Sequence, residues 1–511
     1  MLNKNRQLRK LLILLSGLLI IMACITPGVI SPTQSSGTAT PPFSPGQIGS
    51  AVAMTATALQ SSDFAYPSNP VPFVPGDPTA TPLGSDIMDP NFIAGLAAFD
   101  ADDYDQTVTL MSAVIASNQE LAPPYRYRAN SYWYLGECEL GLADVEKALS
   151  INPDYAAAWA VRGLMYICFE DKARAVESFE KALSIDPSLA FAHINLGIYY
   201  YRDGDYQKAF EEYSLAAAID PTRSDAQAAA SGALGALGRY VECIEEATRA
   251  IKMNEEEWLA YSSRAFCHLR MNDYAAAAAD YEIYLLQNSN DSIAWYNYGI
   301  SQKELGDLQG TVDSYTKALE LDPEYYAAYI NRGNVYVELK QYQKALDDFN
   351  AALQFGDVPL AYAGRGDAYY GMEEYNQAVE EYKTALSMNP ESAHCHCSLA
   401  LTYFELGMYQ DVLDEAQVAY AIDPACGGAK LFEVQARSYY ALGDYDQALI
   451  HINKALELDQ YSLGYYYRGI IYQAAGRDQE AIQDLELFLS VSTNFPKEIA
   501  DAEMRLKQLK K

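Results

Sequence analysis

Prolines recur along this chain at a fixed interval of 34 residues. They fall on one register, with a single residue missing between the fourth and the fifth: Pro153, Pro187, Pro221, Pro323, Pro390 and Pro424. Self-similarity at a fixed period of this length is typical of solenoids, in which each short repeat contacts only its neighbours. The period therefore predicts a stack of small units and argues against a single globular core.

Other places of the repeat support the same register without using proline. If each repeat is numbered so that its proline takes place 32, place 8 is small in all twelve repeats: Gly95, Ala129, Gly163, Gly197, Ser231, Ala265, Gly299, Gly333, Gly366, Ala400, Ala436 and Gly469. Place 11 is tyrosine in eight repeats, and place 27 is alanine in nine. At helical spacing, places 4, 7, 8 and 11 share one face of a first helix, and places 20, 24 and 27 share one face of a second. We expect each repeat to be a helical hairpin that closes at the small residues, with the tyrosine filling the gap above them.

The repeat resembles the tetratricopeptide repeat, as the stretches AAAWAVRGLMYICFEDKARAVESFEKALSIDP (156–187) and YAAYINRGNVYVELKQYQKALDDFNAALQ (326–354) illustrate. The resemblance spans 88–495 and implies an all-α solenoid, a right-handed superhelix of about twelve antiparallel helical hairpins. The expected units are 88–121, 122–155, 156–189, 190–223, 224–257, 258–291, 292–325, 326–358, 359–392, 393–428, 429–461 and 462–495.

Some units depart from the pattern. The unit 224–257 is poor in aromatic residues, with Gln227 and Leu234 where rings are expected, so a softer joint is predicted there. One residue is missing near Asp357, and 425–428 carries a two-residue insertion. The segment 496–511 is predicted to be a capping helix that begins at a proline and ends in cations.

The N-terminus has the layout of an export signal. Four basic residues precede an apolar run at 11–23, which is short for a membrane span and suits the central part of a signal peptide. Its end, Ile21-Met22-Ala23-Cys24, resembles the lipobox of bacterial lipoproteins. We therefore expect a signal peptide at 1–23, lipidation of Cys24 and an exported protein anchored on the extracytoplasmic side of a bacterial membrane. The alternatives are a plain secretory signal or an uncleaved anchor that runs on to Ile30.

Residues 25–87 contain many Pro, Ser, Thr and Ala, few acids and no base. This composition does not bury enough apolar surface to fold, so 24–87 is interpreted as a lipidated cysteine followed by a disordered linker.

The resemblance implies a concave groove lined by places 2, 6, 9 and 13 of the first helices. These places predict a groove that is apolar and rich in amides, with candidate binding residues Tyr127, Asn130, Tyr134, Asn195, Arg202, Phe266, Arg270, Asn297, Asn331 and Asn334. The few bases disfavour a clamp for a C-terminal carboxylate. Asn195, Asn297 and Asn331 match an asparagine ladder that would grip a peptide backbone. The alternative is that asparagine is merely tolerated on a solvated face.

Several other signals are set aside. The net charge of −32 disfavours nucleic acid as a partner. The run His394, Cys395, His396 and Cys397 lies along one helix, where adjacent side chains diverge, so no metal site is expected. The seven cysteines after Cys24 are interpreted as buried free thiols, with the alternative that two that face each other form a disulfide in an exported protein. Arginine recurs at place 7, and one of these arginines is the first residue of the Arg365-Gly366-Asp367 tripeptide. Each is predicted to pack its aliphatic stem against the fold and to pair its guanidinium with an acid.

No catalytic motif is present, so neither an enzyme nor a cofactor is expected. Two functions remain open. The first is a membrane-anchored scaffold or adaptor that binds other proteins or extended peptides in an envelope complex. The second is a capture protein that delivers extracellular peptide or glycan ligands to a transporter or enzyme.

Overall fold

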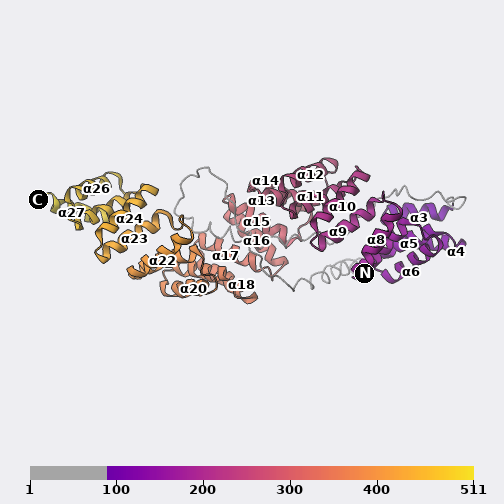
Figure 1. Ribbon diagram of the computed structural model, residues 1–511, viewed down its shortest axis with the longest axis horizontal. Helices are drawn as coiled ribbons and strands as arrows, with labels where there is room; N and C mark the ends of the chain where they lie inside the picture. The colour runs from indigo at the N-terminus through magenta and orange to yellow at the C-terminus, as the bar shows by residue number, and fades with distance from the viewer. Residues whose placement is uncertain (1–88) are drawn as a thin grey trace. The chain divides into compact units, whose positions relative to one another are not determined.

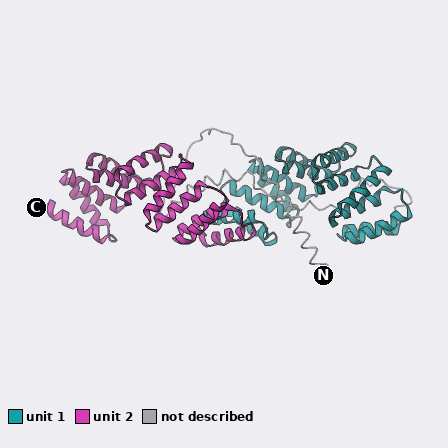
Figure 2. Ribbon diagram, turned by 90° about the horizontal axis from the view of Figure 1, so that it is seen from below, with its two compact units in different colours: residues 1–27, 63–305 teal, residues 28–62, 306–511 magenta. Residues whose placement is uncertain are grey.

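The structure is a computed structural model that describes residues 89–511. The predicted signal peptide 1–23, Cys24 and the linker 25–87 lie outside the described residues. Over 89–511 every regular element is a helix, and the all-α solenoid predicted from the period is confirmed (Figure 1). The chain forms two compact units, which within the described residues comprise 89–305 and 306–511 (Figure 2).

In the first unit each helix packs against the next one along the chain. Its helices are α3 (Pro90–Asp100), α4 (Tyr104–Ser117), α5 (Ala122–Leu135), α6 (Cys138–Ile151), α7 (Ala156–Cys168), α8 (Lys172–Ile185), α9 (Ala190–Arg202), α10 (Tyr206–Ile219), α11 (Ser224–Ala236), α12 (Tyr240–Met253), α13 (Trp258–Arg270), α14 (Tyr274–Gln287) and α15 (Ser292–Glu304).

The second unit follows the same rule of sequential packing. It contains α16 (Leu308–Leu321), α17 (Tyr326–Glu338), α18 (Tyr342–Ala352), the 3-10 turn η4 (Leu353–Phe355), α19 (Pro359–Gly371), α20 (Tyr375–Met388), α21 (Ala393–Glu405), α22 (Tyr409–Ile422), α23 (Gly428–Leu442), α24 (Tyr445–Leu458), α25 (Ser462–Ala474), α26 (Asp478–Val491) and α27 (Pro496–Leu509). The 3-10 turn falls where the sequence lacks one residue.

The turn after each first helix has one conformation throughout. Place 15 has a positive φ in every repeat, at Asp102, Gly136, Glu170, Gly204, Gly238, Asn272, Gly306, Lys340, Glu373, Gly407, Gly443 and Gly476. This left-handed residue ends the first helix. An aspartate at place 16 then caps the second helix in several repeats by accepting a hydrogen bond from its backbone, as Asp171 does from the N–H of Arg174 at 3.0 Å.

Most hairpins close where a small residue at place 8 faces a large one at place 24, which is alanine only at Ala247 and Ala416. A Cβ placed on Gly163 would lie 2.6 Å from a ring carbon of Phe179, and one on Gly333 would lie 2.7 Å from Phe349. Both rings are fully buried. The place-24 side chain occupies the space directly opposite place 8, and the tyrosines at place 11 pack beside it against the core, most of them half-buried.

The aromatic-poor unit 224–257 is closed by small residues instead of rings. The α11 alanines at 226, 228, 229, 230 and 233 are buried, and α11 contacts α13 directly as well as its sequence neighbours α10 and α12. The soft joint was predicted from the missing rings. In the structure, the small buried side chains of α11 let it lie close to α10, α12 and α13, and this close packing takes the place of the rings.

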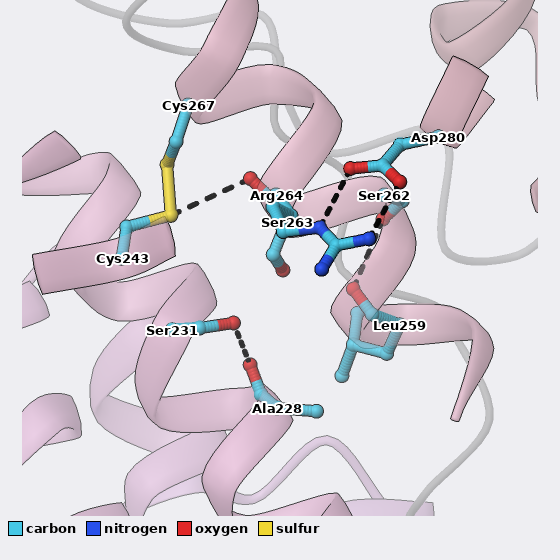
Figure 3. The surroundings of a disulfide bond; sticks show 9 residues. All are labelled: Ala228, Ser231, Cys243, Leu259, Ser262, Ser263, Arg264, Cys267 and Asp280. Atoms are coloured by element: carbon cyan, nitrogen blue, oxygen red, sulfur yellow. Dashed lines mark hydrogen bonds and ion pairs between the residues drawn. A yellow bond between two sulfur atoms is a disulfide. The ribbon is translucent and has the colours of Figure 1, made fainter. Parts of the chain in front are cut away.

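Three disulfides are present among the described residues; two of them connect successive repeats, and the third lies within the unit 393–428. Cys138 bonds Cys168, Cys243 bonds Cys267 and Cys397 bonds Cys426, with Cα–Cα distances of 6.4, 6.5 and 6.5 Å; Figure 3 shows the second. Only Cys395 is a free thiol among the residues the structure describes. The interpretation of these cysteines as free thiols is therefore wrong for six of them, because the packing of the helices brings together cysteines that are 24 to 30 residues apart in the sequence.

The predicted capping segment forms α27. Leu506 is buried against Leu485 and Phe488 of α26, and Ile499 and Leu509 pack beside it, as the sequence pattern predicts. None of the helices within 89–511 is long and apolar enough to cross a membrane.

Candidate functional site

The predicted groove residues lie on first helices, as expected, but in both units. In the first unit, Tyr127, Asn130 and Tyr134 lie on α5, Asn195 and Arg202 on α9, Phe266 and Arg270 on α13, and Asn297 on α15. Asn331 and Asn334 lie on α17 in the second unit. Within the first unit, α5 contacts α7, and α13 contacts both α11 and α15.

Aromatic side chains gather where α5 meets the first hairpin. The rings of Tyr134 and Tyr104 are stacked, with centroids 4.2 Å apart and planes within 3°. Tyr127 packs edge-on against Phe99 and Phe92 at 5.6 and 6.1 Å. The structure thus brings the two predicted tyrosines into one aromatic cluster, a surface that suits apolar or planar groups.

The predicted amides have different environments. Asn130 is 1% exposed, and neither atom of its amide has a hydrogen-bond partner among the described residues. The Nδ2 of Asn195 donates to the carbonyl of Phe191 one turn back, at 2.8 Å. Asn195 and Asn297 are buried, whereas Asn331 and Asn334 are half-buried. The Nδ2 of Asn195 is thus engaged within its own helix.

The basic residues on the first helices also have different environments. Arg202 is exposed at the end of α9. The guanidinium of Arg270 lies 5.6 Å from the ring centre of Tyr240, and Phe266 packs beside the disulfide of Cys243 and Cys267. Lys430, on α23, pairs with Glu433 at 3.2 Å.

The place-7 arginines form a second, structural series. Arg332 donates two hydrogen bonds to Asp348, sixteen residues ahead, at 2.7 and 2.8 Å, and a third to Thr316, sixteen residues behind, at 2.9 Å. Each arginine in the series links its own second helix to the preceding one: Arg128, Arg162, Arg264, Arg332, Arg365 and Arg468. The pairing of Arg264 with Asp280 is visible in Figure 3. The predicted structural role of this place, with an acid as partner, is confirmed.

The same pairing accounts for the Arg365-Gly366-Asp367 tripeptide. It lies within α19, where Arg365 pairs with Glu381 and Asp367 accepts a hydrogen bond from the buried Tyr382 at 2.8 Å. The three residues are part of the hairpin core rather than an exposed loop.

The side chains of the run 394–397 separate toward different partners. His394 lies 3.0 Å from Asp367, and His396 lies 2.6 Å from Glu415. Cys397 is bonded to Cys426, and Cys395 is buried alone. Burial lowers the pKa of His394, but the carboxylate of Asp367 outweighs it, so the net pKa is raised. This arrangement ties α21 to its neighbours.

One site was missed by the sequence reasoning. A cavity of about 590 Å³ lies between α22, α23 and α24 beside Gln435. The available signal was the glutamine itself, which stands at place 7 where six repeats carry arginine.

The comparisons with known proteins agree with the repeat geometry. Models described as tetratricopeptide repeat match residues 126–190, 190–223, 268–310, 326–355 and 434–497, and a model described as TPR repeat matches 366–407. Together these matches cover more than half of the chain. The chain belongs to the tetratricopeptide repeat family.

Relatives of this repeat protein match it over short stretches. Tetratricopeptide repeat protein 6 of Homo sapiens is 32% identical over 122 residues, which is 24% of this chain and 23% of the relative. The chain thus spans about a quarter of the length of that relative.

Two solved structures are also similar. One, of the APC/C hetero-tetramer Cut9–Hcn1, is 13% identical with a TM-score of 0.44, over 83% of this chain and 97% of that one. The other, YrrB, described as having an unusual peptide-binding site, is 25% identical with a TM-score of 0.31, over 37% of this chain and 97% of that one. Tetratricopeptide repeat proteins mediate protein–protein interaction, so this array is a binding module.

Proposed function

We propose that this protein is a scaffold or adaptor for an envelope complex, held by a lipid on Cys24 at the extracytoplasmic side of a bacterial membrane. The observation that carries the binding role is the aromatic surface of α5, where the half-buried rings of Tyr127 and Tyr134 pack against those of Phe99 and Tyr104. Such rings suit apolar or planar groups of a bound polypeptide.

The disulfides support an exported location. Disulfides persist in oxidising compartments and are rare in the cytosol of most organisms. Three cysteine pairs placed for bonding agree with the export signal that the first 24 residues predict. The two observations are independent, because one rests on 138–426 and the other on the N-terminus.

Crosslinking and affinity purification from native membranes test this function. We expect the unaltered protein to retain a defined set of membrane proteins. Tyr127→Ala and Arg202→Glu should lose them while circular dichroism shows unchanged helix content. Glu177→Ala, at an exposed position on α8, is the matched control and should retain them.

Two outcomes would redirect the proposal. If Cys24→Ala leaves the protein in the membrane fraction, lipidation is not the anchor. If purified protein binds free peptides or glycans with no protein partner present, the capture function replaces the scaffold.

The asparagine ladder is tested separately. Replacing Asn195, Asn297 and Asn331 together by alanine should weaken retention of an extended peptide if their amides grip its backbone. Unchanged partner recovery by the triple variant would remove the ladder from the mechanism.

A further inference from the structure

The arginine series defines what normally occupies one position at the junction of two repeats. In six repeats the place-7 guanidinium lies between place 23 of its own second helix and place 25 of the preceding one. Arg468, for example, donates to Asp484 at 2.6 and 2.8 Å and to Asn453 at 2.8 Å. A planar cation thus fills the space between two second helices and neutralises a buried acid.

In the repeat 429–461 this cation is absent. Place 7 is Gln435, place 23 is His451 and place 25 of the preceding repeat is Gln417. Gln435 is only 5% exposed, and its Oε1 has no hydrogen-bond partner. The cavity of about 590 Å³ is lined by these same three residues. The place that a guanidinium fills in six other repeats is therefore open space here, lined by a glutamine whose Oε1 is buried without a partner.

The lining offers hydrogen-bond acceptors and negative charge. Asp414 and Asp444 contribute carboxylates, and no lysine or arginine is among the residues that line the cavity. The Nδ1 of His451 lies 2.9 Å from the carbonyl of Gln447, so Nδ1 carries a proton and donates it, which leaves Nε2 as the ring nitrogen for a ligand. The buried hydroxyl of Tyr420 also has no partner.

Aromatic rings form part of the same lining. Tyr420 stacks on Phe432 at 4.8 Å, and Tyr439 lies 4.9 Å from the His451 ring. A planar cation gains both from hydrogen bonds to the acceptors and from contact with these rings. An ammonium group has three donors at one point, whereas a guanidinium presents five donors in a fixed fork that spans several acceptors.

We propose that this cavity is a binding site for a guanidinium group, supplied by an arginine side chain of a partner polypeptide. The partner's arginine takes the place that the chain's own arginine holds in six other repeats. The site is formed by α22, α23 and α24 of the second unit and shares no residue with the α5 surface, so it does not rest on the function proposed above.

Titration calorimetry on the full detergent-solubilised chain tests the site. The probes are acetyl-Gly-Arg-Gly-amide, its citrulline and lysine analogues, and free arginine. The arginine peptide should bind more tightly than the citrulline peptide, which keeps the shape and loses the charge. Free arginine binding as well as the peptide would assign the source to a free amino acid and overturn the partner-polypeptide assignment. Equal binding of the citrulline and arginine peptides would overturn the site.

Two sets of variants complete the test. Asp414→Asn should weaken binding of the arginine peptide roughly tenfold, because a hydrogen bond to a charged group is lost. Asp411→Asn, on the same helix but outside the lining, should leave binding unchanged. The pair Gln435→Arg with His451→Asp rebuilds the trio of the other repeats, so it should raise the melting temperature and abolish peptide binding. Retained peptide binding in that refilled variant would contradict the proposal.

Discussion

Single side chains carry the coupling between repeats in this molecule. The sequence shows that arginine recurs at place 7 and that an acid must be near, but not which acid. The structure places it sixteen residues ahead in most repeats. Arg162 inverts the pattern, because Glu146 behind it supplies the carboxylate and Ser178 ahead supplies the hydroxyl. Either order satisfies the guanidinium, so spacing alone does not identify the partner.

Removing one member of such a pair should be costly. Arg332 and Asp348 have side chains only 15% and 7% exposed, and Arg332→Met leaves the carboxylate buried without its partner. The expected loss of stability is about 3–5 kcal/mol, measured by urea denaturation. Arg477→Met, which breaks the exposed pair with Glu480, is the matched control and should change stability little. Equal losses of stability in the two variants would show that the place-7 pair contributes no more to stability than an exposed pair.

The contact between places 8 and 24 makes a second prediction. A Cβ added at Gly333 would lie 2.7 Å from the fully buried ring of Phe349, so Gly333→Ala overpacks the hairpin. We expect a loss of about 1–3 kcal/mol in thermal or urea unfolding. Adding Phe349→Leu should restore part of that loss, because the smaller side chain makes room. No recovery in the double variant would mean that the clash is not the cause.

At the scale of the helical element, the sequence specified the hairpins better than their turns. Small residues at place 8 predicted the close approach. The place-24 side chain was not singled out, because its residue type varies from Phe and Tyr through Met, Leu, Ile and Val to Ala. The left-handed turn at place 15 was also missed, since glycine occupies it in only seven of twelve repeats.

The non-glycine residues at place 15 are strained, which predicts a stabilising change. Lys340 has φ 58°, a conformation that costs a side chain about 1–2 kcal/mol. Lys340→Gly should therefore raise stability by about 0.5–1 kcal/mol after the entropy of glycine is counted. Gly204→Ala makes the reverse change where no atom lies within 4 Å of the new Cβ, so it should lower stability through the backbone alone. Melting temperatures that move in the same direction for both would contradict this reason.

The junction between hairpins holds a pH-sensitive contact at His193. Its Nδ1 lies 2.6 Å from Glu212 on α10 and its Nε2 lies 3.1 Å from the carbonyl of Pro187, so a doubly protonated ring satisfies both acceptors. Burial lowers the pKa of His193, but these two hydrogen bonds outweigh it and the net pKa is raised.

A raised folded-state pKa fixes the sign of the pH effect. The stabilisation is fully present below the unfolded pKa of about 6.5 and is lost as pH rises through the higher folded value. The stability advantage of the unaltered protein over His193→Gln should therefore shrink between pH 6 and pH 8.5 in parallel urea titrations. Glu212→Gln should remove most of this pH dependence. An advantage that grows with pH would reverse the assignment.

At the scale of the whole molecule, the 34-residue period predicted the array because every repeat packs its two helices through the same places. The period did not predict the side-chain contacts that form between neighbouring repeats. Cys138 and Cys168 occupy different places of neighbouring repeats, as do Cys243 and Cys267, and their proximity follows from how a second helix meets the next first helix. The cavity beside Gln435 is likewise a property of two repeats together. Within a single repeat, the residues that line this cavity do not indicate a site.

The disulfides make the last prediction, which concerns how the array holds together. Denaturing alkylation followed by peptide mass spectrometry should label only Cys395 among the cysteines of 138–426, and prior reduction should expose six more. In the native state Cys395 should also react slowly, because burial raises its pKa to about 11. Each bridge closes a loop of 24 to 30 residues, so reduction should lower the stability of its region by about 3–4 kcal/mol. Because two of the bridges join neighbouring repeats, urea unfolding after reduction should broaden into separate steps. Labelling of all seven cysteines without reductant would contradict the pairing.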